Sequence, residues 1–262
     1  MEISMIKEVE FEIEEFKILK KAPKKLWYRG NLELLKSPKI SIVGSRRPIQ
    51  YTQKLVKELS FNLAKRGVVI VSGAAMGVDA LAHFGAGFKN TIAIMPNGLD
   101  IKYPAVNSNL IENIYKEGLA LSQFPKGQRA TKWSFVIRNE LVVALGEKLI
   151  IAQADLNSGS LRSAEYALKL NREIFVFPHR IGESKGTDYL LKEGLAKPIF
   201  EIEEFVNSYG KVEQETMKDD FLLFCQKNPT FEEAVSKFGE KVYEAEFEGL
   251  IEIVNGRVEL KV

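Results

Sequence analysis

The sequence predicts an α/β protein with a doubly wound, mostly parallel sheet, followed by a small winged-helix-like domain. Short valine and isoleucine runs such as Val68–Val71 and Thr91–Met95 alternate with helical patterns, which is typical of parallel strands covered by helices on both faces. Turns rich in glycine and serine follow several of these runs. Near the C-terminus, three helical patterns precede Asn255-Gly256, a strong signal for a two-residue hairpin.

The first strand–helix junction, Ile40–Arg47, reads I-S-I-V-G-S-R-R. The apolar run breaks at Gly44, and a helical pattern begins near Ile49. Backbone N–H groups and the partial positive charge at a helix start favour anions, and the planar guanidinium of Arg46 suits phosphate oxygens. The junction therefore predicts a phosphate site. The alternative is an ordinary strand–helix turn with exposed arginines.

The remaining elements follow from the same patterns. Residues 1–20 predict a helix or an ordering arm, and Leu26–Tyr28 predicts a short strand. The later expected strands are Val68–Val71, Thr91–Met95, Gly118–Leu121, Lys148–Ala152 and Glu173–Phe177. The expected helices are Val78–Ala86, Asn107–Lys116, Phe135–Leu145, Leu161–Leu170 and Gly186–Leu195, and Pro198–Ile202 closes the unit.

Three turns made of small or basic residues come directly after predicted strands. They are Gly44–Arg47, Ser72–Gly77 and Asn157–Ser160. Ligands of doubly wound sheets bind at the carboxyl ends of the strands, so we expect these turns to share one edge and to form one groove.

The chain divides into four expected segments: an N-terminal arm (1–37), the sheet domain (38–203), a polar linker (204–216) and the small domain (217–262). Residues 38–200 hold 22 Lys and Arg against 13 Asp and Glu, whereas residues 201–262 hold 7 against 15. A basic domain suggests a polyanionic partner, although a surface that happens to be positive is the alternative. The acidic helices of the small domain oppose phosphate binding and favour a protein-contact or packing role.

The single cysteine, Cys225, excludes an intrachain disulfide framework and a multi-cysteine metal site. The acidic N-terminus does not predict a signal peptide, and no apolar run approaches the length of a membrane span. The expected compartment is therefore the cytoplasm, with no membrane partner.

Catalytic and metal motifs are poorly represented. The chain has no G-x-S-x-G elbow, Walker lysine loop or G-x-G-x-x-G. Asp79 and His83 stand four apart on one predicted helix, but two ligands without a clear third make a weak metal site, so a helix cap or a hydrogen-bonded dyad is favoured. Asp155 and Glu165 are candidates to face the groove without forming a paired carboxylate site. We expect no enzyme activity, metal or cofactor.

The strongest binding segment is Lys126–Asn139, where four cations interleave with Trp133 and Phe135. Cations follow a phosphate backbone and an aromatic face stacks on an unpaired base. Duplex DNA hides its base faces, so this mixture favours single strands. The alternative is that both aromatic residues are core residues at a helix start. We expect this for one of them, and expect Phe135 rather than Trp133 to be exposed.

Several motifs together resemble the DprA/Smf family of DNA-processing proteins of bacterial natural transformation, or competence. They run in family order from about Leu26 to Phe200, some two thirds of the chain. The matching pieces are I-V-G-S-R (42–46), S-G-A-A-M-G-V-D-A-L-A-H (72–83), G-L-D-I-K-Y-P (98–104), N-x-x-L-I (107–111), F-V-I-R-N (135–139), S-G-S-L-R-S-A (158–164) and G-T-D (186–188). Gln123, Gln153, His179 and Asp188 depart from the family pattern.

The resemblance implies an extended Rossmann-like domain over residues 38–203 that binds single-stranded DNA and protects incoming DNA. It also implies a homodimer and the loading of RecA recombinase, and a C-terminal winged-helix-like appendage. By motif, Gly44, Ser45 and Arg46 form the phosphate pocket, while Lys132 is the cation and Phe135 the stacking residue. Arg138 and Asn139 support the loop, and Ser158, Gly159 and Ser160 offer donors.

Two other functions remain open at the level of sequence. One is a nucleotide-binding or nucleotide-hydrolysing enzyme of the related Rossmann-like group, such as a nucleotide phosphoribohydrolase, although the P-G-G-x-G-T loop of that group is absent. The other is a small-nucleotide sensor that uses the Gly44–Arg47 turn. Fold alone does not decide among them.

Overall fold

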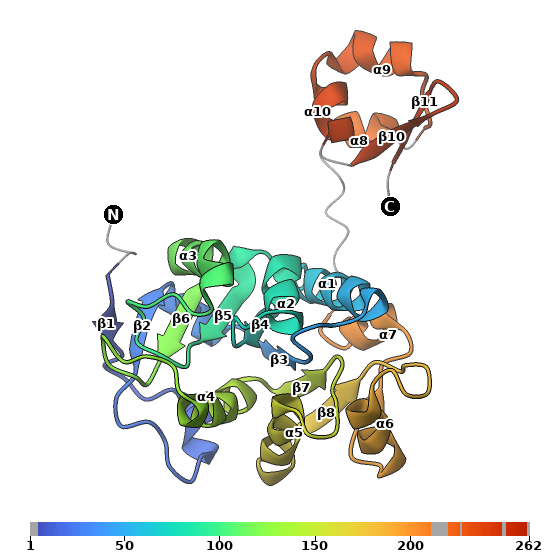
Figure 1. The fold of residues 1–262 in the computed structure, drawn as a ribbon. Coiled ribbons are helices and arrows are strands. Elements are labelled where there is room, and N and C mark those ends of the chain that lie inside the picture. The colour runs from blue at the N-terminus through green and yellow to red at the C-terminus, as the bar shows by residue number, and fades with distance from the viewer. Residues whose placement is uncertain (1–4, 211–219, 226, 248–249, 261–262) are drawn as a thin grey trace. The chain divides into compact units, whose positions relative to one another are not determined.

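The computed structural model describes residues 5–210, 220–225, 227–247 and 250–260. The chain divides into two compact units, Met1–Lys211 and Val212–Val262, each drawn in Figure 1. The first unit carries a nine-stranded sheet and the second a two-stranded one. Among the described residues, no helix is both long and apolar enough to cross a membrane.

The large sheet has the strand order β1-β2-β6-β5-β4-β3-β7-β8-β9. Strands β1 and β2 and strands β2 and β6 pair antiparallel, whereas all other neighbours pair parallel. The strands are β1 (Lys7–Glu8), β2 (Trp27–Gly30), β3 (Lys39–Val43), β4 (Val69–Ser72), β5 (Thr91–Ile94), β6 (Leu119–Ser122), β7 (Lys148–Ile151), β8 (Glu173–Val176) and β9 (Lys197–Pro198). The predicted doubly wound, mostly parallel sheet is confirmed.

The strand order reverses between β3 and β7. From β3 the chain builds outward through β4, β5 and β6, and from β7 it builds the other way through β8 and β9. Val43 at the end of β3 lies opposite Ile151 at the end of β7. The connections that follow β3 and β7 cross to opposite faces of the sheet, and this leaves a crevice at the carboxyl ends of these two strands.

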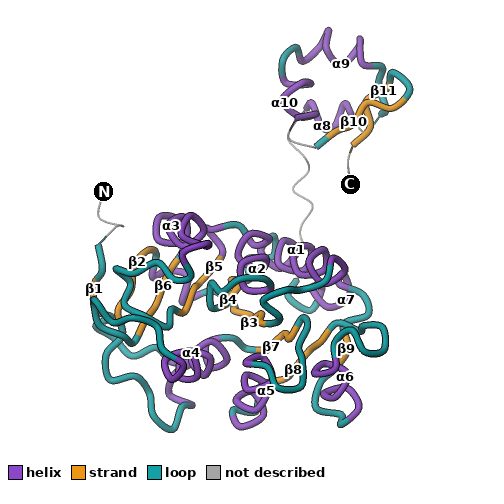
Figure 2. The backbone as a smooth tube through the Cα atoms, viewed as in Figure 1, coloured by secondary structure: helices purple, strands orange, loops and turns teal. Residues whose placement is uncertain are grey.

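Helices cover both faces of the sheet (Figures 1 and 2). One face carries α1 (Gln50–Ala64), α2 (Val78–Ala86), α3 (Ser108–Glu117) and α7 (Ile202–Asn207), and the other carries α4 (Lys132–Leu145), α5 (Gly159–Lys169) and α6 (Lys185–Lys192). Short 3-10 helices cover Glu14–Ile18, Leu32–Lys36, Phe88–Asn90 and Ala105–Asn107.

Alternation along the strands explains these two layers. Ile40 and Ile42 of β3 pack in one cluster with Leu59 of α1, whereas Leu149 and Ile151 of β7 pack in another with α4 and α5. Successive side chains of a strand point to opposite faces, so strands apolar on both sides need helices on both sides.

The N-terminal segment, expected to be a helix or an ordering arm, packs on the sheet domain, and within residues 5–20 it forms a 3-10 helix at Glu14–Ile18 and no α-helix. The segment contributes β1 and β2 to the sheet, and Phe16 of its first 3-10 helix lies in the core. Lys39 of β3 is buried, and its Nζ lies 2.7 Å from a carboxylate oxygen of Glu15. This Nζ also donates to the carbonyl oxygens of Leu35 and Ser37, so a satisfied buried cation anchors the segment.

Two helices of the sheet domain begin two or three residues earlier than predicted. Helix α4 begins at Lys132 instead of Phe135, because Thr131 and Ser134 form a reciprocal capping box. Helix α5 begins at Gly159 instead of Leu161, with Ser158 as its N-cap.

The predicted linker over residues 204–216 is wrong in its first part. Residues 202–207 form α7, and its Val206 is buried in a cluster with α1. The helix is tied to α1 by Arg66, whose guanidinium lies 2.8 Å from Glu203. Residues 211–216 lie outside the described residues.

The second unit contains α8 (Asp220–Cys225), α9 (Phe231–Phe238), α10 (Lys241–Phe247) and a hairpin of β10 (Ile251–Val254) and β11 (Arg257–Leu260). Its core includes Phe221, Val242 and Val258. The sequence predicts helices over residues 221–226, 231–238 and 242–248 and a hairpin of residues 251–254 and 258–262, and the predicted ends at 226, 248 and 261–262 lie outside the described residues. The winged-helix-like assignment stays a prediction.

Candidate functional site

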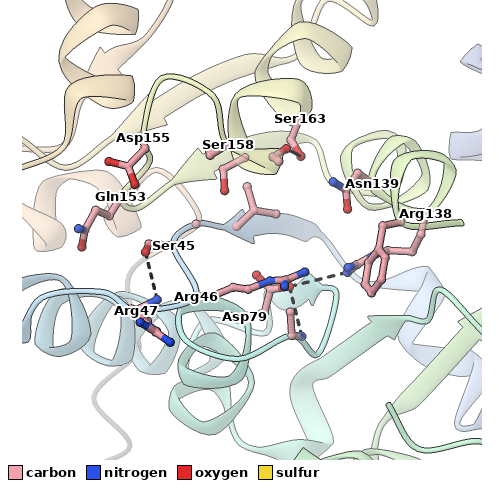
Figure 3. A pocket seen from close by; sticks show the side chains of 16 residues that line it. Ser45, Arg46, Arg47, Asp79, Arg138, Asn139, Gln153, Asp155, Ser158 and Ser163 are labelled. Atoms are coloured by element: carbon pink, nitrogen blue, oxygen red, sulfur yellow. Dashed lines mark hydrogen bonds and ion pairs between the residues drawn. The ribbon is translucent and has the colours of Figure 1, made fainter. Parts of the chain in front are cut away.

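A cavity of about 520 Å³ lies at the reversal of the strand order, beside the ends of β3 and β7 (Figure 3). The turns after β3, β4 and β7 and the side of α4 all contribute to it, as the expected single groove requires. The lining residues are Val43, Gly44, Ser45, Arg46, Arg47, Ala75, Asp79, Phe135, Arg138, Asn139, Gln153, Asp155, Ser158, Gly159, Ser160 and Ser163.

The turn after β3 is held by backbone contacts. The Ser45 N–H donates to the Gln153 carbonyl at 2.8 Å, and the Arg47 N–H donates to Ser45 Oγ at 3.1 Å. A Cβ at Gly44 would lie 2.7 Å from Val78 Cγ2, closer than real contacts allow. The glycine lets the turn pack closely against α2. This packing fixes the position of the backbone that carries the exposed side chains of Arg46 and Arg47.

The turn after β4 is organised by Asp79. Its Oδ2 accepts the Gly73 and Ala75 N–H groups at 3.2 and 3.4 Å, while the intervening Ala74 has a left-handed φ of 54°. The carboxylate also lies 3.7 Å from Arg138 Nη1. Burial raises the pKa of Asp79, and Arg138 and the two N–H groups oppose this rise. Asp79 therefore locks a strained turn against α4.

Arg138 occupies the space that a side chain at position 73 would fill. A Cβ on Gly73 would lie 1.0 Å from Arg138 Nη1, and Arg138 is itself buried. Burial lowers the pKa of Arg138, opposed by its pairing with Asp79. Arg138 thus braces the cavity wall from within α4.

His83 does not pair with Asp79 as a dyad. Its Nδ1 contacts the Thr91 hydroxyl, and Thr91 Oγ1 donates in turn to the Ile70 carbonyl at 3.1 Å. Burial lowers the pKa of His83 to about 3, so it is a neutral core residue near neutral pH. Among the described residues, no three His, Cys, Asp or Glu side chains form a metal-binding group.

Phe135 is half-buried and lies near two cations. The guanidinium carbons of Arg46 and Arg138 lie 5.7 and 5.6 Å from its ring centre, within cation–π range. The ring of Tyr103 lies 5.9 Å away and is tilted by 60°. The cavity therefore combines an aromatic ring with positive charge at one end.

The N-terminus of α5 forms the opposite wall (Figure 3). Ser158 Oγ accepts the Leu161 N–H at 3.3 Å, and Gly159 and Ser160 form the first turn of this 11-residue helix. A Cβ on Gly159 would meet only Asn139 Nδ2, at 3.9 Å. The first-turn N–H groups and the helix dipole make this wall favourable for an anion.

The far end of the cavity carries Gln153 and Asp155. Gln153 Oε1 accepts the Ile49 N–H at 3.0 Å, at the start of α1, so this departure from the family pattern holds two turns together. Asp155 is exposed and lines the cavity, whereas Glu165 is exposed and does not line it.

Nine of the ten residues predicted for the site line the cavity: Gly44, Ser45, Arg46, Phe135, Arg138, Asn139, Ser158, Gly159 and Ser160. Lys132 does not line it and is exposed in the first turn of α4. The expectation for the aromatic pair is wrong, since Trp133 is 64% exposed and Phe135 is half-buried. Ser163 was missed, although its spacing of four from Gly159 places it on the same helix face.

A family model described as DNA recombination-mediator protein A matches residues 3–210. DNA processing protein DprA of Streptococcus pneumoniae is 40% identical over 178 residues, 66% of this chain and 62% of that protein. The protein of the same name from Bacillus subtilis is 35% identical over 188 residues, 70% of this chain and 63% of that protein. The chain therefore spans less than two thirds of the length of these relatives.

Two solved structures are similar in fold and in sequence. One describes the unique single-stranded DNA binding mode of DNA processing protein A from Helicobacter pylori; it has a TM-score of 0.76 and 44% identity over 78% of this chain and 94% of that chain. The other is DNA processing protein A of Streptococcus pneumoniae, with a TM-score of 0.72 and 33% identity over 80% of this chain and 76% of that chain.

Proposed function

Because the chain belongs to the DNA recombination-mediator protein A family, we propose that it binds single-stranded DNA in the cavity beside β3 and β7. The observation that carries this proposal is the convergence of Arg46, the α5 N-terminus and Phe135 on one cavity. The similar protein from Helicobacter pylori binds single-stranded DNA.

The two walls suit the two parts of a nucleotide. Arg46 and the first turn of α5 suit a phosphate, because both present N–H donors and positive charge. Phe135 offers a ring on which a base can stack, and a base is available for stacking only when it is unpaired. Arg138 and Asn139 line the wall between them. This division predicts a preference for single strands over duplexes.

Lys132 has a separate role in this proposal. It stands three residues before Phe135 on α4, and therefore on the same side of the helix. As an exposed cation outside the cavity, it contacts the phosphate backbone beyond the nucleotide that Phe135 holds.

The wider role follows the family. In this proposal the chain protects incoming DNA during natural transformation and helps to load RecA recombinase, acts in the cytoplasm as a homodimer, and performs no catalysis. The nucleotide-hydrolysing alternative is not favoured, because the family and the similar structures are DNA-processing proteins.

The test is the anisotropy of a labelled oligothymidylate, measured against a duplex of equal length at two salt concentrations. The single strand is expected to bind more tightly, with affinity falling by a log–log salt slope of about −0.7 per phosphate contact. Lys132→Ala should reduce the magnitude of that slope by about 0.7. Equal affinity for the two DNAs, or no binding to either, would overturn the proposal.

A further inference from the structure

A second, smaller hollow adjoins the cavity on the side of β5. Its lining comes from the turn after β4, the loop after β5 and α4, and consists of Arg46, Gly73, Ala75, Met76, Pro96, Tyr103, Pro104 and Phe135. Arg46 and Phe135 line both hollows. With a volume of about 30 Å³, the second hollow does not enclose a base, but its rim is an aromatic surface.

That surface is Tyr103, which is 42% exposed, as is its neighbour Met76. The tilted Tyr103 ring lies 5.9 Å from the Phe135 ring, and the Arg46 guanidinium lies over the Phe135 ring at 5.7 Å. Arg46 and Phe135 thus border both hollows, and Tyr103 extends the aromatic surface from Phe135 into the second hollow.

The loop that carries Tyr103 is held at both ends. Asn97 Nδ2 donates to the Gly98 and Ile101 carbonyls at 2.8 and 2.6 Å. Beyond the tyrosine, the Asn107 N–H donates to the Pro104 carbonyl and Asn107 Nδ2 donates to the Ala74 carbonyl, both at 3.0 Å. A ring on a fixed loop loses little conformational entropy when a ligand stacks on it.

We propose that Tyr103 is the platform for a second base, so that the single strand leaves the cavity between Arg46 and Phe135 and runs toward the loop after β5. This inference rests on the proposed function and adds a direction to it. Arg46 pairs with the phosphate between the two bases. The second hollow suits a polyanion, because Arg46 lines it whereas Asp155, whose exposed carboxylate lines the main cavity, does not.

Tyr51 provides a matched control. It is 49% exposed, lies in the first turn of α1 and lines neither hollow. Its ring contacts His179 at 5.7 Å. Tyr51→Leu removes an exposed ring of the same kind on another flank of the cavity.

The experiment compares Tyr103→Leu, Tyr103→Phe and Tyr51→Leu with wild type, using a long oligothymidylate and thymidine 3′,5′-bisphosphate, a mononucleotide with one base that fills only the main cavity. Tyr103→Leu should weaken binding of the long strand by about 5- to 20-fold, the lower part of the range for one stacked base, without changing the salt slope. Tyr103→Phe and Tyr51→Leu should bind the long strand like wild type, and all four proteins should bind the mononucleotide equally. A 2-aminopurine next to the cavity nucleotide should be quenched by wild type and not by Tyr103→Leu.

The outcomes separate the two proposals. Wild-type affinity and quenching in Tyr103→Leu would overturn the second platform while leaving single-strand binding intact. Absence of single-strand binding in wild type would overturn the proposed function itself. Loss of mononucleotide binding in Tyr103→Leu would assign the effect to a damaged cavity and would also overturn the second platform.

Discussion

Replacement of Asp79 by alanine is expected to lower the free energy of unfolding by about 3–5 kcal/mol, because it leaves the Arg138 guanidinium buried without its counter-ion. Both side chains are almost fully buried, 9% and 6% exposed. The Gly73 and Ala75 N–H groups lose their acceptor in the same step. Urea denaturation followed by circular dichroism measures the loss.

Two controls test the reason for that loss. Asp155→Ala removes an exposed carboxylate from the same cavity and should change stability by less than about 0.5 kcal/mol. The double variant Asp79→Ala with Arg138→Met removes both charges, so it should be more stable than Asp79→Ala alone. If the double variant is instead less stable than either single variant, the buried ion pair is not the cause.

Replacement of Arg46 by alanine is expected to weaken binding of single-stranded DNA by about 30- to 100-fold, the loss of a charged hydrogen-bonding group at a phosphate. Arg46 lines both hollows and lies over the Phe135 ring, so it touches both the phosphate and the stacked base in this account. The log–log salt slope should also fall in magnitude by about 0.7. Anisotropy titrations at two or more salt concentrations measure both effects.

A conservative variant of Arg46 and a variant of a distant cation show whether the geometry of the guanidinium or its charge causes the loss of affinity. Arg46→Lys should recover the salt slope but only part of the affinity, since an ammonium lacks the planar donor fork. Lys57→Ala removes an exposed cation of α1 that lines neither hollow and should bind like wild type. An equal loss in Lys57→Ala and Arg46→Ala would show that only net charge matters.

The sheet was predictable because its signal is local and repeated. Helix α2 begins and ends where the sequence predicts, at Val78 and Ala86. A turn of small residues precedes it and marks its N-terminal end. The start of helix α4 was harder to predict. Trp133 is an apolar residue in its first turn, and the Thr131–Ser134 capping box uses serine where glutamate or glutamine is usual. Helix α7 was missed because it is only six residues long. Its apolar residues Ile202, Phe205 and Val206 stand in an otherwise polar stretch that is typical of a linker.

Most of the site was also predictable, since parallel strands bring the turns after them to one edge. What the sequence does not show is which side of α4 faces that edge. Trp133 and Phe135 are only two residues apart, so they point in different directions on a helix. Because the predicted start of α4 was three residues too late, the sequence left open which of the two rings is buried. The bracing of Gly73 by Arg138 joins residues 65 positions apart, and no spacing rule finds such a contact.

The central claim is that the cavity beside β3 and β7 holds single-stranded DNA, and photo-crosslinking tests it most directly. A single strand that carries 5-bromodeoxyuridine would be irradiated with the full chain, and the modified residues would be located by mass spectrometry. The account predicts crosslinks at Phe135, with Tyr103 as the next site, and their loss in Arg46→Ala. Crosslinks confined to residues 212–262, or to exposed rings away from the cavity such as Phe61, would contradict it.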